Sequence, residues 1–354
     1  MQDNYIYCIG LMSGTSLDGI DLAYIKMHEN LYVDFKIIQA DTVLYSNEWK
    51  NKLQEAINYD KKDLQILDVD YGKFIGKTLN DFIREHHISK LDFIASHGHT
   101  ILHQPEVGIT LQIGNGQEIS NITKKEVVCD FRTQDVALGG QGAPLVPIGD
   151  KLLFSNYSYC INLGGFANIS FEDDNKRIAF DICPVNIVLN HYCNKLGLEY
   201  DDEGKIASNG NVNNELLDCL NNLEFYKKEA PKSLGLEWVQ STIFPLVDKL
   251  EVDIPTILRT FIEHIAIQIS AVLIENSKIL VTGGGAFNCF LMERLEILSK
   301  NRVVLTSNML INYKEALIFA LLGLLKKQNK VNCLQSVTGA SRNHSSGNIF
   351  YPQK

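Results

Sequence analysis

The sequence lacks the features that mark secreted and membrane-spanning proteins. It has eight cysteines in 354 residues, but no Cys-x-x-Cys pair. Most of them lie in apolar runs, such as Tyr159-Cys160-Ile161, so we expect reduced core cysteines in a cytoplasmic protein. No N-terminal stretch combines a charged head with a long apolar core. The apolar stretch 317–325 is too short to cross a membrane and predicts a buried helix instead.

Positive charge is also in deficit. Lys and Arg number 33 against 42 Asp and Glu, which gives a net charge of -9 at pH 7. This balance argues against nucleic acid and anionic membranes as partners, because both attract basic surfaces. It does not exclude an anionic nucleotide, since loop amides and a magnesium ion can supply a local positive field. A chain of 354 residues exceeds one comfortable hydrophobic core, so two domains are expected.

The most informative segment is a glycine-containing turn near the N-terminus, over 10–21. An apolar strand over 5–9 leads into it and a second strand over 22–25 follows, so a hairpin is predicted. Glycines let the backbone approach a ligand, and turn amides with hydroxyl groups can converge on an anion. Asp18 and Asp21 can hold a magnesium ion that bridges to a phosphate. The alternative is an ordinary hairpin whose Ser and Asp side chains cap their own turn.

Two further glycine-rich turns lie in the second half of the chain. A strand, Gly164-Gly165 and a returning strand repeat the hairpin pattern over 157–171. A buried strand over 279–281 runs into three glycines, 283–285, and then into a helix whose free N-terminal amides favour an anion. Each turn alone is also explained by crowding of the backbone. Three such turns in two halves of one chain favour a nucleotide held between two lobes.

The sequence resembles the anhydro-N-acetylmuramic acid kinase family, a branch of the sugar kinase/Hsp70/actin superfamily. The resemblance covers essentially the whole chain and is carried by several long motifs in the family's order. These motifs occupy residues 12–19, 96–100, 110–114, 130–132, 139–147, 162–165, 282–288 and 337–340.

The resemblance implies an α/β protein with the two-lobed actin-like ATPase (ribonuclease H-like) fold and a nucleotide in the cleft between the lobes. Residues 1–135 are expected to form the first lobe, joined by the C-terminal tail 331–354, and residues 136–330 the second. It also implies an enzyme that uses ATP and Mg2+ to open the 1,6-anhydro ring of 1,6-anhydro-N-acetylmuramic acid with water and to phosphorylate O6. The products would be N-acetylmuramic acid 6-phosphate and ADP, in peptidoglycan recycling. Because the family forms dimers, a homodimer is expected.

The residues that match the family's nucleotide site lie in the three glycine-rich turns. Both hairpins are expected to bind phosphate, and the triple-glycine turn is expected to bind adenosine. The matching residues are Gly14, Thr15, Ser16, Leu17, Asp18, Gly19, Ile20, Asp21, Asn162, Gly164, Gly165, Gly283, Gly284, Gly285 and Asn288. The identity of the metal ligands stays open.

Asp181 is the candidate catalytic residue. The sequence places it at the end of a short strand, before a proline turn and a helix over 187–195. A carboxylate in that place can accept a proton from water or from a sugar hydroxyl. The alternative is that Asp181 caps the following helix. The resemblance favours catalysis, because the matching Asp of the family activates the water that attacks the anomeric carbon.

The segment after Asp181 departs from the family's pattern. The family commonly has Thr and two glycines where this chain has Ile182, Cys183 and Val185, and an Asp where it has Asn190. The added side chains are expected to narrow the turn or to exclude positive φ. The loss of a carboxylate can alter a metal or water contact. A kinase of the same build for another anhydrosugar is therefore an alternative.

Arg132 is the expected sugar anchor, because a guanidinium binds a carboxylate with two hydrogen bonds and muramic acid carries a lactyl carboxylate. The alternative is an ion pair with Asp130 or Asp135. The resemblance adds a glutamate that opens a helix, for which a favourable interaction with the helix dipole is the alternative. The residues that the resemblance adds to the sugar site are Ser96, His97, Gly98, Thr100 and Glu315.

Three histidines near this motif leave another class of function open. His97 and His99 share one face if they lie on a strand, which is how some zinc hydrolases begin a metal site, and His103 follows them. The family commonly has Gln at position 99. A metal-dependent hydrolase is therefore one alternative to the kinase. A non-catalytic, actin-like nucleotide-binding protein is another, although the presence of Asp181 and Arg132 argues against it.

Overall fold

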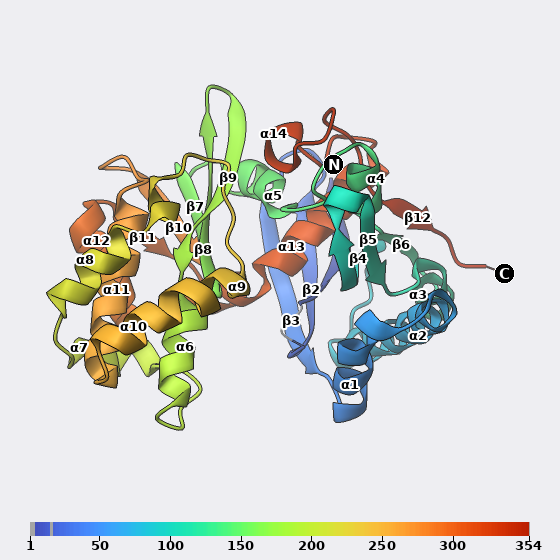
Figure 1. Cartoon of the computed structure of the whole chain (residues 1–354). Coiled ribbons are helices and arrows are strands. Elements are labelled where there is room, and N and C mark those ends of the chain that lie inside the picture. The colour runs from blue at the N-terminus through green and yellow to red at the C-terminus, as the bar shows by residue number, and fades with distance from the viewer. Residues whose placement is uncertain (1–3, 15–16, 354) are drawn as a thin grey trace. The chain divides into compact units, whose positions relative to one another are not determined.

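The chain forms two compact units (Figure 1). The structure is a computed structural model that describes residues 4–353 except 15 and 16. One unit comprises Met1–Leu153 and Tyr313–Lys354, and the other comprises Phe154–Asn312. The first unit is therefore assembled from both ends of the chain, and the second is a continuous segment between them.

The first unit is built on a seven-stranded sheet. Its strands are β1 (Tyr5–Ser13), β2 (Gly19–His28), β3 (Phe35–Leu44), β4 (Phe93–Gln104), β5 (Ile109–Ile113), β6 (Glu126–Cys129) and β12 (Asn348–Phe350). The first three form an antiparallel meander, and β4 and β6 continue the sheet beside β1 as parallel strands. β5 pairs with β4 and β12 pairs with β6, both in antiparallel orientation.

The five-stranded sheet of the second unit repeats this plan. Its strands are β7 (Tyr159–Leu163), β8 (Phe166–Asp173), β9 (Lys176–Pro184), β10 (Lys278–Thr282) and β11 (Arg302–Leu305). Here too a three-stranded antiparallel meander is followed by two parallel strands on the side of its first strand. This shared strand order is the ribonuclease H-like plan, and it confirms the expected α/β class. The sequence shows no such internal repeat, because the order depends on strand pairing and not on residue identity.

Helices cover both faces of the first sheet. They are α1 (Asn47–Glu55), α2 (Lys61–Glu85), α3 (Gly116–Thr123), α4 (Thr133–Ala137), α5 (Val146–Leu153), α13 (Asn308–Lys327) and α14 (Gln335–Thr338). Successive side chains of a strand point to opposite faces. Ile9 and Leu11 of β1 therefore join the buried apolar cluster that contains α2 and α3, whereas Gly10 between them faces α13.

Small residues let α13 lie directly on the sheet. A Cβ on Gly10 would be 1.8 Å from the carbonyl oxygen of Ala316, and a Cβ on Gly323 would be 2.8 Å from the Cβ of Ala95. The helix is longer than the apolar stretch in the sequence indicated. By length and composition alone it could cross a membrane, but most of it is buried inside the structure, as expected of a core helix.

Both boundaries between the units differ from those expected from the sequence, which were 135/136 and 330/331. The reason is that α5 and most of α13 pack with the first sheet. A Cβ on Gly149 of α5 would lie 2.6 Å from the side chain of Ile318 in α13. The second boundary falls within α13 at Tyr313, where φ of -114° and ψ of 17° depart from helical values.

The helices of the second unit pack around one long central helix. They are α6 (Asn186–Asn194), α7 (Lys205–Ser208), α8 (Asn214–Asn221), α9 (Leu236–Trp238), α10 (Phe244–Leu250), α11 (Ile254–Ser270) and α12 (Cys289–Ser299). The central helix, α11, is capped at its N-terminus by Asp253, whose carboxylate accepts a hydrogen bond from the amide of Thr256. Its apolar residues at helical spacing, such as Ile257, Phe261 and Ile265, are buried in the core of this unit.

The cysteines agree with the expectation of a reduced protein. None of the eight forms a disulfide bond, and six of them are buried. The exposed two are Cys219 and Cys289. Most of the thiols therefore serve as small core side chains.

Candidate active site

The turn between β1 and β2 carries the first expected phosphate site, of which Thr15 and Ser16 lie outside the described residues. The carbonyl oxygen of Gly14 accepts a hydrogen bond of 3.5 Å from the amide of Leu17, which has a positive φ of 60°. A Cβ on Gly19 would lie 2.5 Å from a carbonyl oxygen of β3. The chain therefore enters β2 along a path that excludes any side chain at position 19.

Two carboxylates of this hairpin influence each other. Asp18 is exposed, and the neighbouring Ile20 is buried in the core. Asp21 is half-buried, and its Oδ1 accepts a hydrogen bond of 2.6 Å from Oγ1 of Thr42 on β3. Burial raises the pKa of Asp21, the bond from Thr42 lowers it, and the charge of Asp18 raises it. A cation beside these carboxylates would relieve both their repulsion and the cost of burial.

A chain of hydrogen bonds fixes the base of the hairpin. Oγ of Ser13 lies 2.7 Å from Nδ1 of His99 and 2.7 Å from the hydroxyl of Tyr45, which in turn bonds the hydroxyl of Tyr71. Ser13 is 1% exposed, so its hydroxyl serves this buried chain. Burial lowers the pKa of His99 to about 4, which keeps the ring neutral at physiological pH.

Arg132 is held by a buried histidine and a carbonyl. Its Nε and Nη2 lie 3.1 and 2.9 Å from Nε2 of His97, and its Nη1 donates to the carbonyl oxygen of Gly142 at 2.6 Å. Nδ1 of His97 lies 3.0 Å from the carbonyl oxygen of Gly98 and must donate there, so Nε2 is the acceptor for Arg132. Burial, and then the charge of Arg132, lower the pKa of His97 well below its ordinary value. A neutral ring therefore orients the guanidinium.

Neither aspartate that the sequence offered as an alternative partner forms a hydrogen bond with Arg132 in the structure. Asp130 accepts hydrogen bonds from Thr133 and Asn348. Asp135 accepts them from the amide of Gly142 and from two residues of the C-terminal segment. Because each carboxylate has its own donors, the guanidinium keeps donors that no described residue uses.

The remaining residues of the expected sugar site surround His97 on β4. Ser96 is fully buried, and its hydroxyl accepts a hydrogen bond from the amide of Gly98. Gly98 has a φ of 72°, and a Cβ there would lie 2.4 Å from a β5 carbonyl oxygen. After this bend, His97 lies beside the guanidinium of Arg132 and His99 beside the hydroxyl of Ser13. Thr100 is half-buried and accepts a hydrogen bond from the side chain of Gln112.

Glu315 on α13 interacts electrostatically with Arg132 and with the charged residues near it. Burial raises its pKa, the charges of Lys314 and Arg132 lower it, and Asp21 raises it. Nζ of Lys314 lies 2.7 Å from a carboxylate oxygen of Asp150 on α5, and both side chains are nearly fully buried. The first unit thus brings Arg132, Glu315 and Asp21 into one neighbourhood, with Lys314 fixed behind it.

In the second unit, the turn between β7 and β8 rests on the N-terminus of α6. The carbonyl oxygens of Gly164 and Gly165 accept hydrogen bonds from the first amides of α6 and the residue before it. Nδ2 of Asn186 donates to the carbonyl oxygen of Leu163 at 3.1 Å. The amides of this helix end are therefore used to hold the turn, and the helix end itself is not available to an anion.

The triple-glycine turn connects β10 to α12. Gly283 has a φ of 82°, and a Cβ there would lie 2.7 Å from Oδ1 of Asn162 on β7. A Cβ on Gly285 would lie 2.7 Å from the Cβ of Leu163. Asn288 is nearly buried and caps α12, because its Oδ1 accepts a hydrogen bond from the amide of Leu291. The turn is thus fixed by crowding on one side and by a helix cap on the other.

Three glycines of these turns have no structural explanation within the fold. Among glycines whose surroundings are described, all others have either a positive φ or a contact tighter than 3.4 Å at the position of a Cβ. At Gly164, Gly165 and Gly284 the nearest atoms would lie at 3.4, 3.8 and 3.6 Å, which is ordinary contact, and no positive φ is present. An alanine would fit each position as far as the protein itself is concerned. The absence of a side chain at these three positions is therefore available for the close approach of a ligand.

Asp181 lies within β9 opposite Asn168 of β8, and not at the strand end that the sequence indicated. Its Oδ2 accepts a hydrogen bond of 2.9 Å from the amide of Leu234, and its own amide donates to the carbonyl oxygen of Lys232 at 3.0 Å. Its other carboxylate oxygen takes no hydrogen bond from the described part of the chain. Burial raises the pKa of Asp181, and the bond from Leu234 lowers it. This is a held carboxylate with one oxygen free to accept a proton.

The unusual residues after Asp181 point into the core. Ile182, Cys183 and Val185 are at most 2% exposed and belong to the apolar cluster of the second unit. None of them has a positive φ, as expected for residues with side chains. The pairing of β8 with β9 shifts register here, so one residue is bulged between Asp181 and Cys183. The side chains therefore fill space beneath Asp181 instead of narrowing a turn above it.

Three contributing residues were not named as site residues from the sequence: Asn186, Lys314 and Leu234. Asn186 has a signal, since it follows Asp181 in the same motif. Lys314 adjoins Glu315 and could have been found by that adjacency. Leu234 has no sequence signal, because it acts through its backbone amide.

Comparison with solved structures found a dehydratase component and a gluconate kinase. The chain is similar to (R)-2-hydroxyglutaryl-CoA dehydratase component A from Acidaminococcus fermentans, with 15% identity, 91% of this chain and 99% of that chain covered, and a TM-score of 0.48. It is also similar to gluconate kinase from Lactobacillus acidophilus, with 11% identity, 99% and 94% covered, and a TM-score of 0.48.

Sequence comparison gives a full-length match. The family model of anhydro-N-acetylmuramic acid kinase matches residues 6–352. The anhydro-N-acetylmuramic acid kinase of Bacillus cereus strain AH187 is 33% identical over 381 residues, covering 98% of this chain and 100% of the relative. That of Bacillus thuringiensis subsp. konkukian strain 97-27 is 33% identical over 382 residues, with the same coverage. The chain belongs to the anhydro-N-acetylmuramic acid kinase family.

Proposed function

We propose that this protein uses ATP and water to convert 1,6-anhydro-N-acetylmuramic acid into N-acetylmuramic acid 6-phosphate and ADP. One observation carries the proposal: a full-length family match coincides with three glycines, Gly164, Gly165 and Gly284, that the fold itself does not require. The family supplies the reaction, and these glycines supply space for a nucleotide in the second unit.

The triphosphate is proposed to bind at the two hairpins and the adenosine at the triple-glycine turn. In the second unit the carbonyl groups of the Gly164-Gly165 turn are used by α6. In the first unit Ser13 is used by the buried hydrogen-bond chain, so Thr15, Ser16 and the backbone amides of that turn are proposed as phosphate donors. Asn162 and Asn288 contribute by shaping the triple-glycine turn.

Magnesium fits the carboxylates of the first hairpin. Asp21 and Asp18 repel each other, and burial disfavours the charge on Asp21, so a hard cation with oxygen ligands suits them. These two residues are proposed to hold it, directly or through water. When bound, the metal supplies neutralisation of charge between the β- and γ-phosphates.

The protein residues divide the chemistry between two carboxylates and one guanidinium. The substrate's lactyl carboxylate is proposed to accept the two guanidinium N–H groups of Arg132 that remain after three of its five are used by His97 and Gly142. Asp181 accepts a proton from a water molecule whose oxygen bonds to C1 as the C1–O6 bond breaks. O6 then takes the γ-phosphoryl group, and ADP leaves. Glu315 is proposed to bind a sugar hydroxyl.

Substituting Gly284 by alanine is expected to separate nucleotide binding from stability. The fold accommodates the added Cβ, so the thermal midpoint should stay unchanged, whereas the Kd of ATP should rise roughly ten- to a hundredfold because the ligand is displaced. Calorimetric titration and a thermal melt measure the two quantities. Gly285→Ala is the contrasting variant: its Cβ would clash with Leu163, so it should lose stability. Unchanged ATP affinity in Gly284→Ala would refute the proposal that the nucleotide binds at the triple-glycine turn.

The proposed activity is tested by ADP release from Mg-ATP with and without the anhydro sugar. We expect ADP only when 1,6-anhydro-N-acetylmuramic acid is present, with N-acetylmuramic acid 6-phosphate identified by mass spectrometry. No ADP above background despite measurable ATP binding would reject this substrate. Turnover with another anhydrosugar would then favour the second candidate, which the core location of Ile182, Cys183 and Val185 does not support.

A cytoplasmic location and a homodimer complete the proposal. The eight free cysteines are compatible with a reducing compartment. The dimer is proposed from the behaviour of the family alone, and sedimentation at micromolar concentration tests it.

A further inference from the structure

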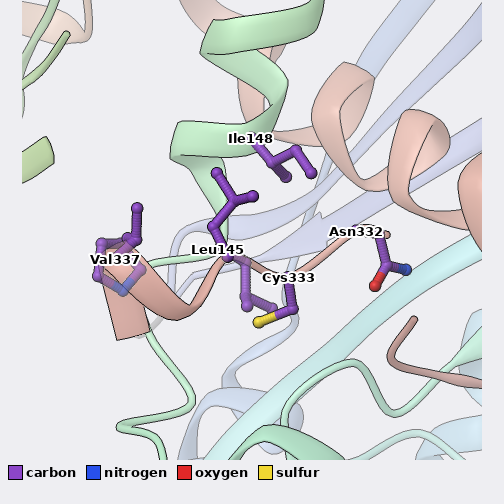
Figure 2. A pocket seen from close by; sticks show the side chains of 7 residues that line it. Leu145, Ile148, Asn332, Cys333 and Val337 are labelled. Atoms are coloured by element: carbon purple, nitrogen blue, oxygen red, sulfur yellow. The ribbon is translucent and has the colours of Figure 1, made fainter. Parts of the chain in front are cut away.

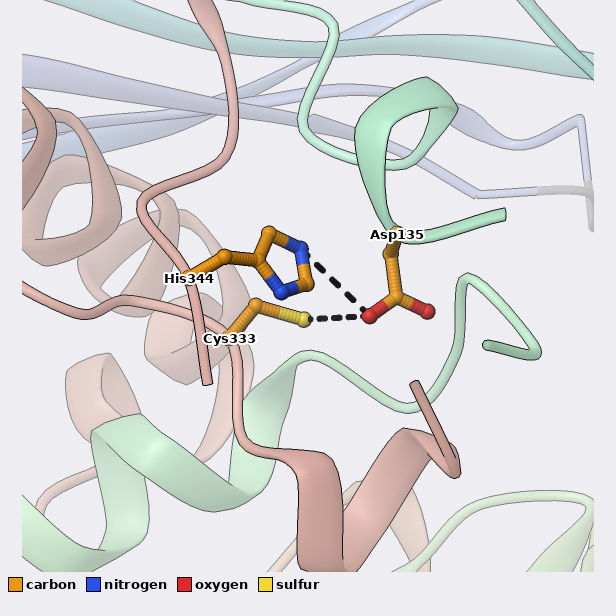
Figure 3. A group of neighbouring side chains, drawn as sticks. All are labelled: Asp135, Cys333 and His344. Carbon is orange, nitrogen blue, oxygen red and sulfur yellow. Dashed lines mark hydrogen bonds and ion pairs between the residues drawn. The ribbon is translucent and has the colours of Figure 1, made fainter. Parts of the chain in front are cut away.

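Asp135, Cys333 and His344 form a buried cluster of three metal-ligating side chains in the first unit (Figure 3). Sγ of Cys333 lies 3.0 Å from Oδ1 of Asp135, and Nε2 of His344 lies 3.5 Å from the same oxygen. All three ligand atoms lie within 4.8 Å of one another, and the three residues are 0, 1 and 6% exposed. The proposed kinase chemistry uses none of them.

The histidine of this cluster faces the carboxylate with an unsatisfied nitrogen. Nδ1 of His344 lies 3.1 Å from the carbonyl oxygen of Arg342, so Nδ1 carries the proton and donates it there. Nε2 is buried and forms no hydrogen bond with any described residue. A bare nitrogen lone pair and a carboxylate oxygen repel each other unless a cation lies near both. Metal-binding histidines typically donate their second ring N–H to a carbonyl in this way.

The distances between the ligand atoms of the cluster, and their charges, suit a zinc ion. Ligand atoms on a tetrahedral zinc ion lie about 3–4 Å apart, because Zn–N, Zn–O and Zn–S distances are about 2.0–2.3 Å. We propose that Asp135, Cys333 and His344 bind a structural zinc ion, with water or the hydroxyl of Thr338 in the fourth position. A divalent ion, one thiolate and one carboxylate sum to zero charge, so the loaded site buries no net charge. On binding, the Cys333 thiol releases its proton to solvent as the Zn–S bond forms.

A narrow depression lies beside Cys333, next to the cluster (Figure 2). Its walls enclose too little space for a water molecule. They are formed by Pro144, Leu145, Ile148, Asn332, Cys333, Leu334 and Val337.

The proposed ion would fasten the C-terminal segment to the loop beside Arg132. The amide of Gln141 donates to the carbonyl oxygen of Thr338 at 2.7 Å, so the two segments already pair through their backbones. Oδ2 of Asp135 accepts a hydrogen bond from the amide of Gly142, whose carbonyl oxygen holds Arg132. Zinc on Oδ1 of Asp135 would thus stabilise the loop that orients the guanidinium.

Metal content and cobalt spectroscopy of the full chain test this proposal. We expect one equivalent of zinc to survive gel filtration in metal-free buffer, and chelation to lower the thermal midpoint. Cobalt(II) added to the stripped protein should give a thiolate charge-transfer band and the visible bands of a tetrahedral ion. Cys333→Ser and His344→Gln should each weaken zinc binding by at least about tenfold. The double variant Cys219→Ser/Cys289→Ser, which removes the exposed thiols, should retain the ion.

Two results would overturn the zinc site. One is a stripped chain that takes up no zinc and shows no thiolate–cobalt band, which would leave the three side chains without a metal ion. The other is zinc uptake that persists in Cys333→Ser but disappears in the Cys219/Cys289 double variant. The cobalt spectrum of the unaltered chain decides the question even if the Cys333 or His344 variants fail to fold. None of these readouts depends on kinase activity.

Discussion

Replacing Asp181 with asparagine is expected to lower turnover by roughly 10²–10⁴-fold, the usual contribution of a general base. The amide is nearly isosteric, and its oxygen can still accept the hydrogen bond from the amide of Leu234, so the local structure should persist. Nucleotide affinity should stay within about twofold, because the substitution removes a proton acceptor and no proposed nucleotide contact. Single-turnover ADP release and ATP titration measure the two effects separately.

Asp173→Asn is the matched control for this substitution. Asp173 lies exposed at the far end of β8, and the change removes the same charge from the same sheet. It should leave turnover unchanged. A full rate in Asp181→Asn would remove Asp181 from the catalytic role, whereas equal losses in both variants would indicate a general effect of charge on this unit.

Replacing Arg132 with alanine is expected to reduce kcat/KM for the muramic acid substrate by far more than it reduces ATP binding. Truncating one member of a hydrogen-bonded charge pair costs about 2–5 kcal/mol, or roughly 30- to 3,000-fold. Part of that cost is structural, because Nε2 of His97 and the carbonyl oxygen of Gly142 lose their donors. A comparison that isolates the carboxylate contact is therefore needed.

An anhydrosugar without the lactyl group, 1,6-anhydro-N-acetylglucosamine, supplies that comparison. If Arg132 binds the lactyl carboxylate, the unaltered enzyme should prefer the muramic sugar and Arg132→Ala should lose most of that preference. Arg132→Lys should recover only part, since an ammonium cannot form the paired hydrogen bonds. Arg84→Ala, which removes an exposed arginine paired with Asp81, should behave like the unaltered enzyme. Equal losses for both sugars would show that Arg132 acts only through His97 and Gly142.

The turns of the candidate site could be predicted from the sequence because glycine and apolar runs report local geometry. Both hairpins and the strand–glycine–helix junction lie where the pattern placed them. The sequence could not distinguish glycines needed by the fold, such as Gly285, from those that the fold leaves open, such as Gly284. That distinction depends on which atoms from elsewhere in the chain, such as those of Leu163, come near.

Residues whose partners are distant in sequence were predicted less well. The sequence left a neighbouring aspartate open as the protein partner of Arg132, whereas its observed partners in the protein are His97 and the carbonyl oxygen of Gly142. Its binding of a carboxylate ligand stays a prediction. The strand position of Asp181 and the buried direction of Ile182 follow from a register shift between β8 and β9. Strand register is decided by pairing across the sheet, which a single strand's sequence does not specify.

The division of the first unit between the two ends of the chain has a consequence for biosynthesis. Synthesis proceeds from the N-terminus, so β1 with Gly10 emerges early, whereas Ala316, which lies against it, emerges near the end. The continuous segment Phe154–Asn312 contains every strand of its own sheet and can complete its core on the ribosome. The N-terminal part of the first unit is then expected to wait, with one face of its sheet uncovered, until α13 is translated. The second unit is therefore expected to complete its core before the first, and the uncovered sheet is the surface that a nascent-chain chaperone would have to protect.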